Sequence, residues 1–409
     1  MPLVVQKFGG TSVADPDRIL EVADHVVRTR RHGSDVVLVV SAMGKETDDL
    51  LHLAGQVAKV PPGREMDMLI TAGERKAMAL VTMAITELGV PAASFTGSQA
   101  GFITDTTHGN AKILEMRPER LRESLTRGEV PVVGGSQGMS TTREVTFLGR
   151  GGSDTTAVAL AAALGADACE LYTDVTGVFT ADPRVVPGAR RMAVVSFDEM
   201  LEMTATGCPK PAMRSVEFAR RHHVPLHVRS AFTWETGTWV REEDPDMEQP
   251  IISAVTHDTS EAKVTVTGVP DQPGIAARLF RSLADEHVNV DMIVQNVSTG
   301  GHTDISFTVP RSDLAVGLSV VHAHAAEIDA TSVTHDGEIG RVSLIGAGMK
   351  SNPGVAATMF EVLADHGINI EMISTSAIRI SCVVREDAVE KAVQVLHDAF
   401  GLDEPGGGF

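Results

Sequence analysis

Short apolar runs alternate with longer segments of helical periodicity along the first part of the chain. The apolar runs lie at residues 3–8, 36–40, 130–133 and 169–173, and the helical stretches between them include 17–31 and 155–164. Each run has the length and apolar content of a buried strand. Strands that alternate with helices in this way predict an α/β sandwich with a largely parallel central sheet.

A second pattern occupies the C-terminal part, where a motif recurs 80 residues later, from Pro273 to Pro353. The matching positions are Pro273-Gly274 and Pro353-Gly354, Leu283-Ala284-Asp285 and Leu363-Ala364-Asp365, Asn289 and Asn369, and Met292 and Met372. In each copy a β-branched strand (264–267 or 342–345) leads through the Pro-Gly turn into an amphipathic helix, and a second strand starts near the asparagine. The repeat predicts two copies of one small α+β module.

A linker is predicted between the two patterns. Residues 241–250 are polar and acidic and include Pro245 and Pro250. We therefore expect a first domain over residues 1–245, and the two modules over 260–335 and 336–405.

The composition indicates a folded protein, since 43% of the 409 residues are hydrophobic and 22% are charged. A net charge of −19 repels nucleic acid and anionic membranes, and no local basic patch reverses it. Because the sequence has neither an apolar stretch of about 18 residues nor a signal peptide, we expect a cytoplasmic protein. Cys169, Cys208 and Cys382 lack ligand spacing, so neither a disulfide framework nor a metal site on protein side chains is expected.

The first of two glycine-rich loops follows the strand 3–8. This strand contains Lys7 and runs into Gly9-Gly10-Thr11-Ser12 before a helix that starts near Asp15-Pro16. Glycine amides can approach phosphate oxygens closely, and Lys7 could neutralise charge on a transferred phosphoryl group. A purely structural turn is the alternative for this segment.

The second loop, residues 148–156, combines glycines, hydroxyls, Arg150 and Asp154 at a predicted helix start. The alternative is a capped turn in which Asp154 or Thr155 is the N-cap and Arg150 is solvated. A third loop, 41–47, follows the strand 36–40 and would lie at the carboxyl edge of the same sheet, where open α/β folds bind ligands. Segments 71–74 and 173–184 are further polar loops, which alone indicate solvated turns more readily than sites.

Taken together, these residues resemble the aspartate kinase family. The motifs that carry the resemblance are Lys7-Phe8-Gly9-Gly10-Thr11-Ser12-Val13, Ser41-Ala42-Met43, Thr71-Ala72-Gly73-Glu74-Arg75, Gly149-Arg150-Gly151-Gly152-Ser153-Asp154 and Thr180-Ala181-Asp182-Pro183-Arg184. The repeat after Thr259 resembles the paired regulatory ACT domains of that family. The resemblance implies an amino-acid-kinase sandwich followed by two ferredoxin-like ACT modules, as in the monofunctional enzymes that lysine and threonine inhibit jointly.

The resemblance implies ATP-dependent phosphorylation of the β-carboxylate of L-aspartate, which is the first step of lysine, threonine and methionine biosynthesis. Lys7 would contact the transferred phosphoryl group, and Asp154 would orient Lys7. The implied aspartate-binding residues are Thr47, Glu74 for the ammonium group, Arg150 and Ser153 for the carboxylates, and Gly151 and Gly152. The substrate carboxylate is ionised at neutral pH, so positioning and charge neutralisation should make a general base unnecessary.

The family also implies a nucleotide side and an effector site. The implied ATP-binding residues are Lys7, Phe8, Gly9, Gly10, Ser41, Thr173, Asp174, Phe179, Asp182, Arg184 and Lys210, and Mg²⁺ would be held mainly by the ATP phosphates. The implied residues for a lysine or threonine effector are Asp271, Ala276, Asn289, Asp291, Gln295, Asn369 and Ser376. Pairing of ACT modules implies a homo-oligomer, and relatives of this type make a shorter regulatory subunit from an internal start, here near Met247.

Several positions depart from the family's motifs. Ser136 stands where relatives carry phenylalanine, Thr176 replaces an aspartate, Ala377 replaces a glutamate, and Lys210 is displaced by one position. Because Pro209 and Pro211 flank Lys210, residues 208–211 are not expected to continue a helix.

Two other functions stay open on the sequence alone. One is a kinase of the same fold with another acceptor, such as acetylglutamate, carbamate or UMP, which Glu74, Arg150 and the tandem repeat disfavour. The other is a catalytically weak or idle amino-acid sensor that uses only the ACT modules. The intact Lys7, Arg150 and Asp154 argue against that sensor.

Overall fold

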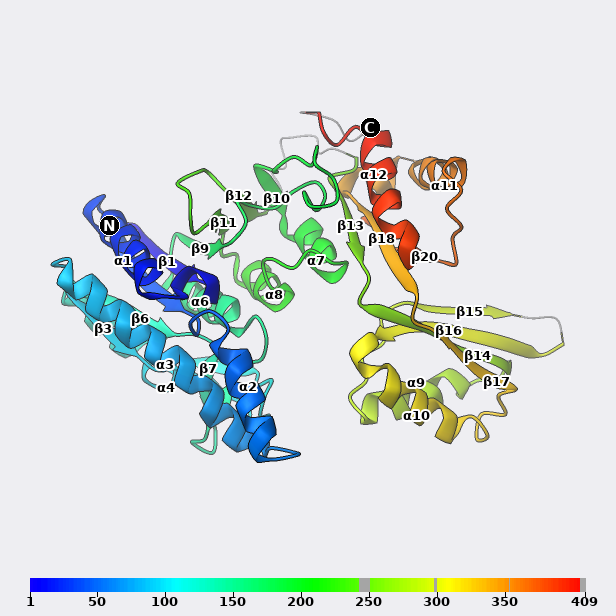
Figure 1. The fold of residues 1–409 in the computed structure, drawn as a ribbon, viewed down its shortest axis with the longest axis horizontal. Helices are drawn as coiled ribbons and strands as arrows, with labels where there is room; N and C mark the ends of the chain where they lie inside the picture. The colour runs from blue at the N-terminus through cyan, green and yellow to red at the C-terminus, as the bar shows by residue number, and fades with distance from the viewer. Residues whose placement is uncertain (243–250, 298–299, 353, 405–409) are drawn as a thin grey trace. The chain divides into compact units, whose positions relative to one another are not determined.

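The structure is a computed structural model that describes residues 1–242, 251–297, 300–352 and 354–404. The chain forms two compact units (Figure 1). The first contains Met1–Val178, Arg191–Thr204 and residues 209–242, and the second contains Phe179–Arg190, Ala205–Cys208 and the described residues from 251 onward. Two short segments upstream of the predicted linker therefore belong to the second unit. Residues 243–250 of that linker, with the internal start expected at Met247, lie outside the described residues.

An eight-stranded sheet forms the centre of the first unit, in the order β10-β12-β11-β9-β1-β2-β6-β3. Its strands are β1 (Leu3–Phe8), β2 (Asp35–Val40), β3 (Ala92–Phe95), β6 (Val130–Gly134), β9 (Ala168–Thr173), β10 (Val194–Ser196), β11 (Leu226–Ser230) and β12 (Thr238–Arg241). All neighbouring strands pair in parallel except β11 with β12. The predicted largely parallel sheet is confirmed, and all four predicted apolar runs are strands.

Helices pack against both faces of this sheet. The helices up to residue 222 are α1 (Pro16–Arg31), α2 (Glu46–Val57), α3 (Gly63–Glu87), α4 (Gly97–Ala100), α5 (Glu119–Thr126), α6 (Gly152–Leu164), α7 (Phe197–Ala205) and α8 (Met213–His222). Phe8, Leu38 and Val132 face one core cluster with buried residues of α1 and α3. Alternate residues of a strand point to opposite faces, so Lys7 points to the other side, where α6 contacts β1 and β9.

A smaller sheet in the same unit has the order β5-β4-β7-β8. Its strands are β4 (Phe102–Thr104), β5 (Ile113–Met116), β7 (Gln137–Ser140) and β8 (Val145–Phe147). The chain leaves β4 into the loop 105–112 and leaves β8 into the glycine-rich loop that precedes α6. This sheet therefore fixes the ends of two loops near the start of α6.

The second unit contains two four-stranded antiparallel sheets, each with two helices. The first module consists of β14 (Glu261–Pro270), α9 (Ile275–Asp285), β15 (Ile293–Val297), β16 (His302–Pro310), α10 (Leu314–His324) and β17 (Ser332–Asp336). The second consists of β13 (Ala254–Asp258), β18 (Ile339–Ile345), α11 (Val355–Asp365), β19 (Met372–Thr375), β20 (Arg379–Arg385) and α12 (Val389–Ala399). The predicted repeat of one α+β module is confirmed, and α9 and α11 begin after matching left-handed glycines, Gly274 and Gly354.

Two features of this unit differ from the sequence-based expectation. The strands expected near Asn289 and Asn369 begin at Ile293 and Met372. The second sheet also takes its edge strand, β13, from a segment that precedes the whole first module. Ala181 and Val186, from the segment Phe179–Arg190, are buried in the core of this second module. The second module is therefore built from segments that lie both before and after the first module in the sequence.

Candidate active site

The buried ion pair of Lys7 and Asp154 forms the centre of the candidate site. Lys7 lies near the carboxyl end of β1, and its Nζ is 2.6 Å from Oδ1 of Asp154, in the first turn of α6. The Ala212 N–H donates to the other carboxylate oxygen at 3.2 Å. Burial alone would raise the pKa of Asp154, but the positive charges of Lys7 and Lys210 hold it below its ordinary value. The pair places a fixed cation at the edge of the sheet where the predicted phosphate loop begins.

Glycines allow the loops after β1 and β2 to pack against each other beside this cation. A Cβ atom on Gly10 would lie 2.8 Å from the carbonyl oxygen of Ala42, and one on Gly9 would lie 3.5 Å from Nζ of Lys7. The N–H of Gly44 donates to the carbonyl of Gly10 at 2.9 Å. The third predicted loop, 41–47, therefore lies next to the first, as expected from the carboxyl edge of a parallel sheet.

Glu74 provides a buried carboxylate close to the same loop. It lies on α3 with 3% of its surface exposed, and its Oε2 has no hydrogen-bond partner. Burial raises the pKa of Glu74 to about 7, and the charge of Glu46 adds to this, although a hydrogen bond from the Ala42 N–H opposes it. A buried carboxylate with a free oxygen beside a second carboxylate is suited to receive a cationic group.

The start of α6 differs from the simple capped turn that the sequence left open. Its N-cap is Gly151, in the left-handed region at φ 73°, and no side chain caps the helix, so neither Asp154 nor Thr155 has that role. Oγ of Ser153 lies 2.9 Å from Oγ of Ser136, one of the positions that depart from the family's motifs. Ser136 itself has a positive φ of 58°. The serine therefore adds a hydrogen bond to the predicted substrate loop.

Arg150 extends into solvent at the tip of this loop. Its side chain is 94% exposed, and its nearest ion-pair partner is Asp48, in the first turn of α2, at 4.0 Å. Thr47, one residue earlier in α2, is half-buried. The structure thus brings Lys7, Gly9, Gly10 and Asp154 together, while Arg150 is solvated, as the alternative interpretation expected.

Of the predicted nucleotide residues, Thr173 and Asp174 follow β9, and the Thr173 hydroxyl donates to the Asp174 carboxylate at 2.9 Å. Lys210 is exposed between α7 and α8, and residues 208–211 are not helical, as predicted. Phe8 ends β1 and is buried, and Ser41, the first residue after β2, is half-buried. Phe179, Asp182 and Arg184 belong to the second unit, where Asp182 accepts a bond from the Arg184 guanidinium at 2.6 Å.

The predicted effector residues lie in the second unit and are mostly exposed. The exposed members are Asp271, Asn289, Asp291, Gln295, Asn369 and Ser376, and Ala276 is half-buried on α9. Asp291 forms an ion pair with Arg341 of β18, whose side chain is only 2% exposed.

Arg341 also lies 3.2 Å from a carboxylate oxygen of Glu261 and 3.6 Å from one of Asp258. It donates to the carbonyl of Ala205 at 2.9 Å. Burial raises the pKa of Glu261 to about 7, with the charges of Asp291 and Asp258 adding to the rise and Arg341 opposing it. One buried arginine therefore serves as the shared cation of three carboxylates, and its single charge does not balance all of them.

Sequence reasoning missed Arg341, and it also missed Asp67, His108 and Arg214 of the first unit. Each forms hydrogen bonds with residues more than 35 positions away. One available signal was the position of Asp67, because it falls on the apolar stripe of α3 with Ile70, Thr71 and Glu74.

Within the described ranges, no group of three or more His, Cys, Asp or Glu side chains could hold a metal ion. Cys169, Cys208 and Cys382 are not joined in disulfides in the described part of the chain. No helix of the described chain is both long and apolar enough to cross a membrane.

Comparison with family models matches residues 2–230 to the amino acid kinase family, and residues 264–324 and 342–400 to the ACT domain. The chain is 57% identical over 407 residues to the aspartokinase of Mycolicibacterium smegmatis, covering 98% of this chain and 97% of that protein. It is 49% identical over 406 residues to the aspartate kinase of Pseudomonas putida, covering 99% of each.

Solved structures of full-length relatives are also similar. E. coli aspartokinase III in complex with aspartate and ADP, in the R-state, matches with a TM-score of 0.83 and 25% identity, over 98% of this chain and 100% of that one. The same enzyme in complex with lysine and aspartate, in the T-state, matches with a TM-score of 0.75 and 26% identity, over 97% and 99%.

We predict that Arg341→Met lowers the free energy of unfolding of the full chain by about 2 kcal/mol, because three carboxylates lose their shared cation. A raised carboxylate pKa contributes stability below the unfolded value near 4.5, and that stability is lost as the pH rises through about 7. Arg341 opposes the rise of this pKa, so its removal costs more at pH 8, where Glu261 is ionised, than at pH 5, where Glu261 is protonated. Urea denaturation followed by circular dichroism measures the free energy of unfolding.

The control is Arg311→Met, which removes a half-buried partner of Glu386. An equal loss of unfolding free energy in both variants would contradict the prediction.

Proposed function

The chain belongs to the aspartokinase family and is an aspartate kinase with ACT regulatory domains, and from this we propose how its residues serve the reaction. The enzyme transfers the γ-phosphoryl group of ATP to the β-carboxylate of L-aspartate. The membership favours aspartate over acetylglutamate, carbamate or UMP as acceptor, and it favours an active kinase over an idle sensor.

We propose that Lys7 neutralises the charge that develops on the transferred phosphoryl group, and that Asp154 holds Lys7 in place. The 2.6 Å ion pair between them is the observation that carries this assignment. An ammonium group fixed by a buried carboxylate needs no reorganisation when the charge develops, which is how preorganised electrostatics accelerate a reaction. The β-carboxylate is already ionised, so the side chains need only position it.

Aspartate would bind between α3 and the loop before α6. Glu74 would receive the ammonium group with its unpartnered Oε2, and Ser153 and Arg150 would hold the carboxylates, with Thr47 and the Gly151 and Gly152 amides beside them. The exposed Arg150 would fold onto the substrate, since a guanidinium binds a carboxylate through two parallel hydrogen bonds.

The nucleotide side of the proposal rests on loops at the carboxyl edge of the central sheet. The residues of the first unit that would bind the nucleotide are Phe8, Gly9, Gly10, Ser41, Thr173, Asp174 and Lys210. The family resemblance also implies Phe179, Asp182 and Arg184, which belong to the second unit. Lys210 contributes positive charge near Asp154, which supports its place beside the phosphates. Mg²⁺ would be held mainly through the ATP phosphates and would neutralise their charge; the ion pair of Asp154 with Lys7 leaves that carboxylate little capacity for a metal.

We also propose that lysine, threonine or both regulate the enzyme through the residues around Asp291. A homo-oligomer formed through ACT modules, with a shorter subunit that starts near Met247, remains part of this proposal. An effector ammonium group would compete with Arg341 for the Asp291 carboxylate.

The first of three predictions from the proposed function tests the phosphoryl-transfer assignment. Lys7→Met and Arg150→Ala should each lower kcat/KM for aspartate by at least about 100-fold, because each removes a charge that faces an anion in the transition state. A coupled assay of ADP release measures this, with Lys59→Met, an exposed lysine, as the control. Near-normal turnover of either variant would show that its residue is wrongly assigned.

The second prediction concerns pH. Because the pKa of Glu74 is about 7 in the free enzyme, falling pH should protonate it and raise KM for aspartate, by up to about tenfold for each pH unit below 7. Glu74→Gln should raise KM at pH 8 and remove this slope, and Glu87→Gln, exposed at the end of the same helix, should keep it. An unchanged slope in Glu74→Gln would exclude Glu74 as the titrating group.

The third prediction concerns the effector. Calorimetric titration of lysine and threonine into the full chain should detect binding, and Asp291→Asn should weaken it by roughly tenfold or more, since a hydrogen bond to a charged group is worth about 1.5–3 kcal/mol. Asp285→Asn, exposed on α9, is the matched control. Absence of heat from both amino acids would remove the sensor role.

A further inference from the structure

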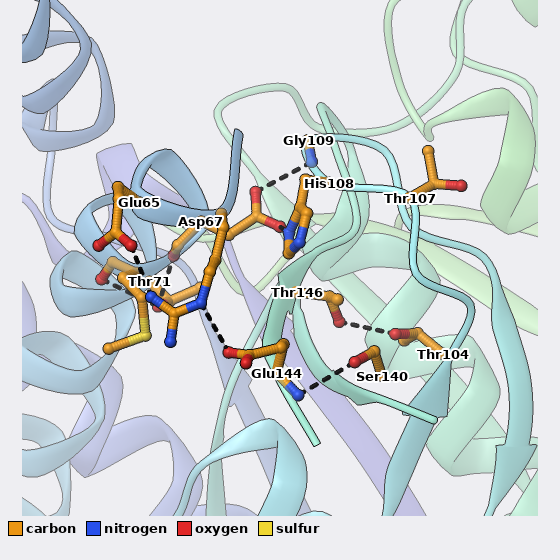
Figure 2. A network of polar contacts seen from close by, with 12 residues as sticks. Glu65, Asp67, Thr71, Thr104, Thr107, His108, Gly109, Ser140, Glu144 and Thr146 are labelled. Atoms are coloured by element: carbon orange, nitrogen blue, oxygen red, sulfur yellow. Dashed lines mark hydrogen bonds and ion pairs between the residues drawn. The ribbon is translucent and has the colours of Figure 1, made fainter. Parts of the chain in front are cut away.

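Asp67 is a fully buried carboxylate on α3 that lies outside the residues assigned to aspartate or ATP. Its Oδ2 lies 2.7 Å from Nδ1 of His108, and its Oδ1 accepts a hydrogen bond from the N–H of Gly109 at 2.9 Å (Figure 2). Both oxygens thus have partners in the loop 105–112. A carboxylate removed from water is costly unless it is paired and hydrogen-bonded, so Asp67 and this loop hold each other in place.

The contact between α3 and the loop is close. A Cβ atom on Gly63, the first residue of α3, would lie 3.0 Å from Cβ of His108. At the base of the loop, the backbone N–H of Asp105 donates to the carbonyl of Lys112, and the Lys112 N–H donates back to the Asp105 side chain. The loop is therefore closed at its base and attached to α3 through His108 and Gly109.

The same loop packs against the glycine that precedes Arg150. A Cβ atom on Gly149 would lie 2.9 Å from Oδ1 of Asn110 and 3.4 Å from the carbonyl oxygen of Gly109. Arg214 joins the two loops, because it donates to the carbonyls of Leu148 and Ala111 at 2.9 and 2.8 Å. A shift of the loop 105–112 would therefore shift the loop that carries Arg150.

The helix that carries Asp67 also carries Glu74. The two residues are seven positions apart, which places both carboxylates on one face of α3 about 10 Å apart along its axis. Both are buried, unlike most acidic side chains of a helix. One rigid helix thus holds the proposed ammonium-binding carboxylate and the attachment point of the proposed carboxylate-binding loop.

We propose that Asp67 and His108 are positioning residues for L-aspartate, and that they fix the distance between Glu74 and the loop 149–152. The proposal rests on the proposed function, in which these two elements bind opposite groups of the substrate. Small displacements of positioning elements are expensive in catalysis, because the bound substrate must stay close to its reactive geometry. Loss of the contact should therefore weaken aspartate binding and leave the nucleotide side unchanged.

The experiment compares three His108 and Arg64 variants of the full-length enzyme in steady-state kinetics. His108→Ala should raise KM for aspartate by roughly tenfold and change KM for ATP less than about twofold. His108→Asn should return KM for aspartate to near the value of the unmodified enzyme. The asparagine side-chain N–H can occupy the place of Nδ1 and donate to Asp67. Arg64→Ala breaks the exposed ion pair of Arg64, on the first turn of α3, with Glu144 and should alter neither KM.

The outcomes separate this proposal from a merely structural role. Thermal denaturation of each variant shows whether the change in KM follows a change in stability. The positioning role would be overturned if His108→Ala changed KM for aspartate and KM for ATP equally, or if His108→Asn did not restore KM for aspartate. An unchanged KM for aspartate in His108→Ala would overturn it as well. If Glu74→Gln raises KM for aspartate while His108→Ala does not, the positioning role fails alone. If Glu74→Gln has no effect, the proposed aspartate site itself fails.

Discussion

The rest of the first unit depends on keeping one ammonium group buried beside one carboxylate. A buried ion pair is favourable only when its geometry is good and its remaining hydrogen bonds are satisfied. Strand β1 is held between two parallel strands and places Lys7, and α6 presents Oδ1 of Asp154 at 2.6 Å from the Lys7 Nζ. The other oxygen of Asp154 accepts a hydrogen bond from the Ala212 N–H. The glycines at positions 9 and 10 then leave space beside the cation for loops and ligands.

The fold was predictable where the pattern is local. The β-branched runs 36–40 and 130–133 are buried on both faces, so they gave the parallel strands, and the repeated Pro-Gly turns gave the two ACT modules. Strand partners are set by tertiary contacts that a local pattern does not contain. For this reason the pairing of β13 with β18, and the burial of Ala181 and Val186 in the second unit, were not predicted.

The candidate site was likewise predictable only where its residues lie in local sequence motifs. Lys7, Asp154 and the glycines lie in short motifs, so the sequence identified them together. Asp67 and His108 were missed because they are single side chains 41 residues apart, and neither lies in a motif. A polar residue on the apolar stripe of a helix was nevertheless visible, and in α3 that stripe contains both Asp67 and Glu74.

Excess negative charge recurs where each unit is proposed to bind an amino acid. Glu74 lies near Glu46, and Glu261 lies near Asp258 and Asp291, and in both cases burial and like charge raise a carboxyl pKa to about 7. Such a group binds a proton more tightly than a free carboxyl does, and an ammonium group that neutralises the same charge displaces that proton. On the proposed site assignments, binding of substrate and binding of effector would both be linked to pH near neutrality.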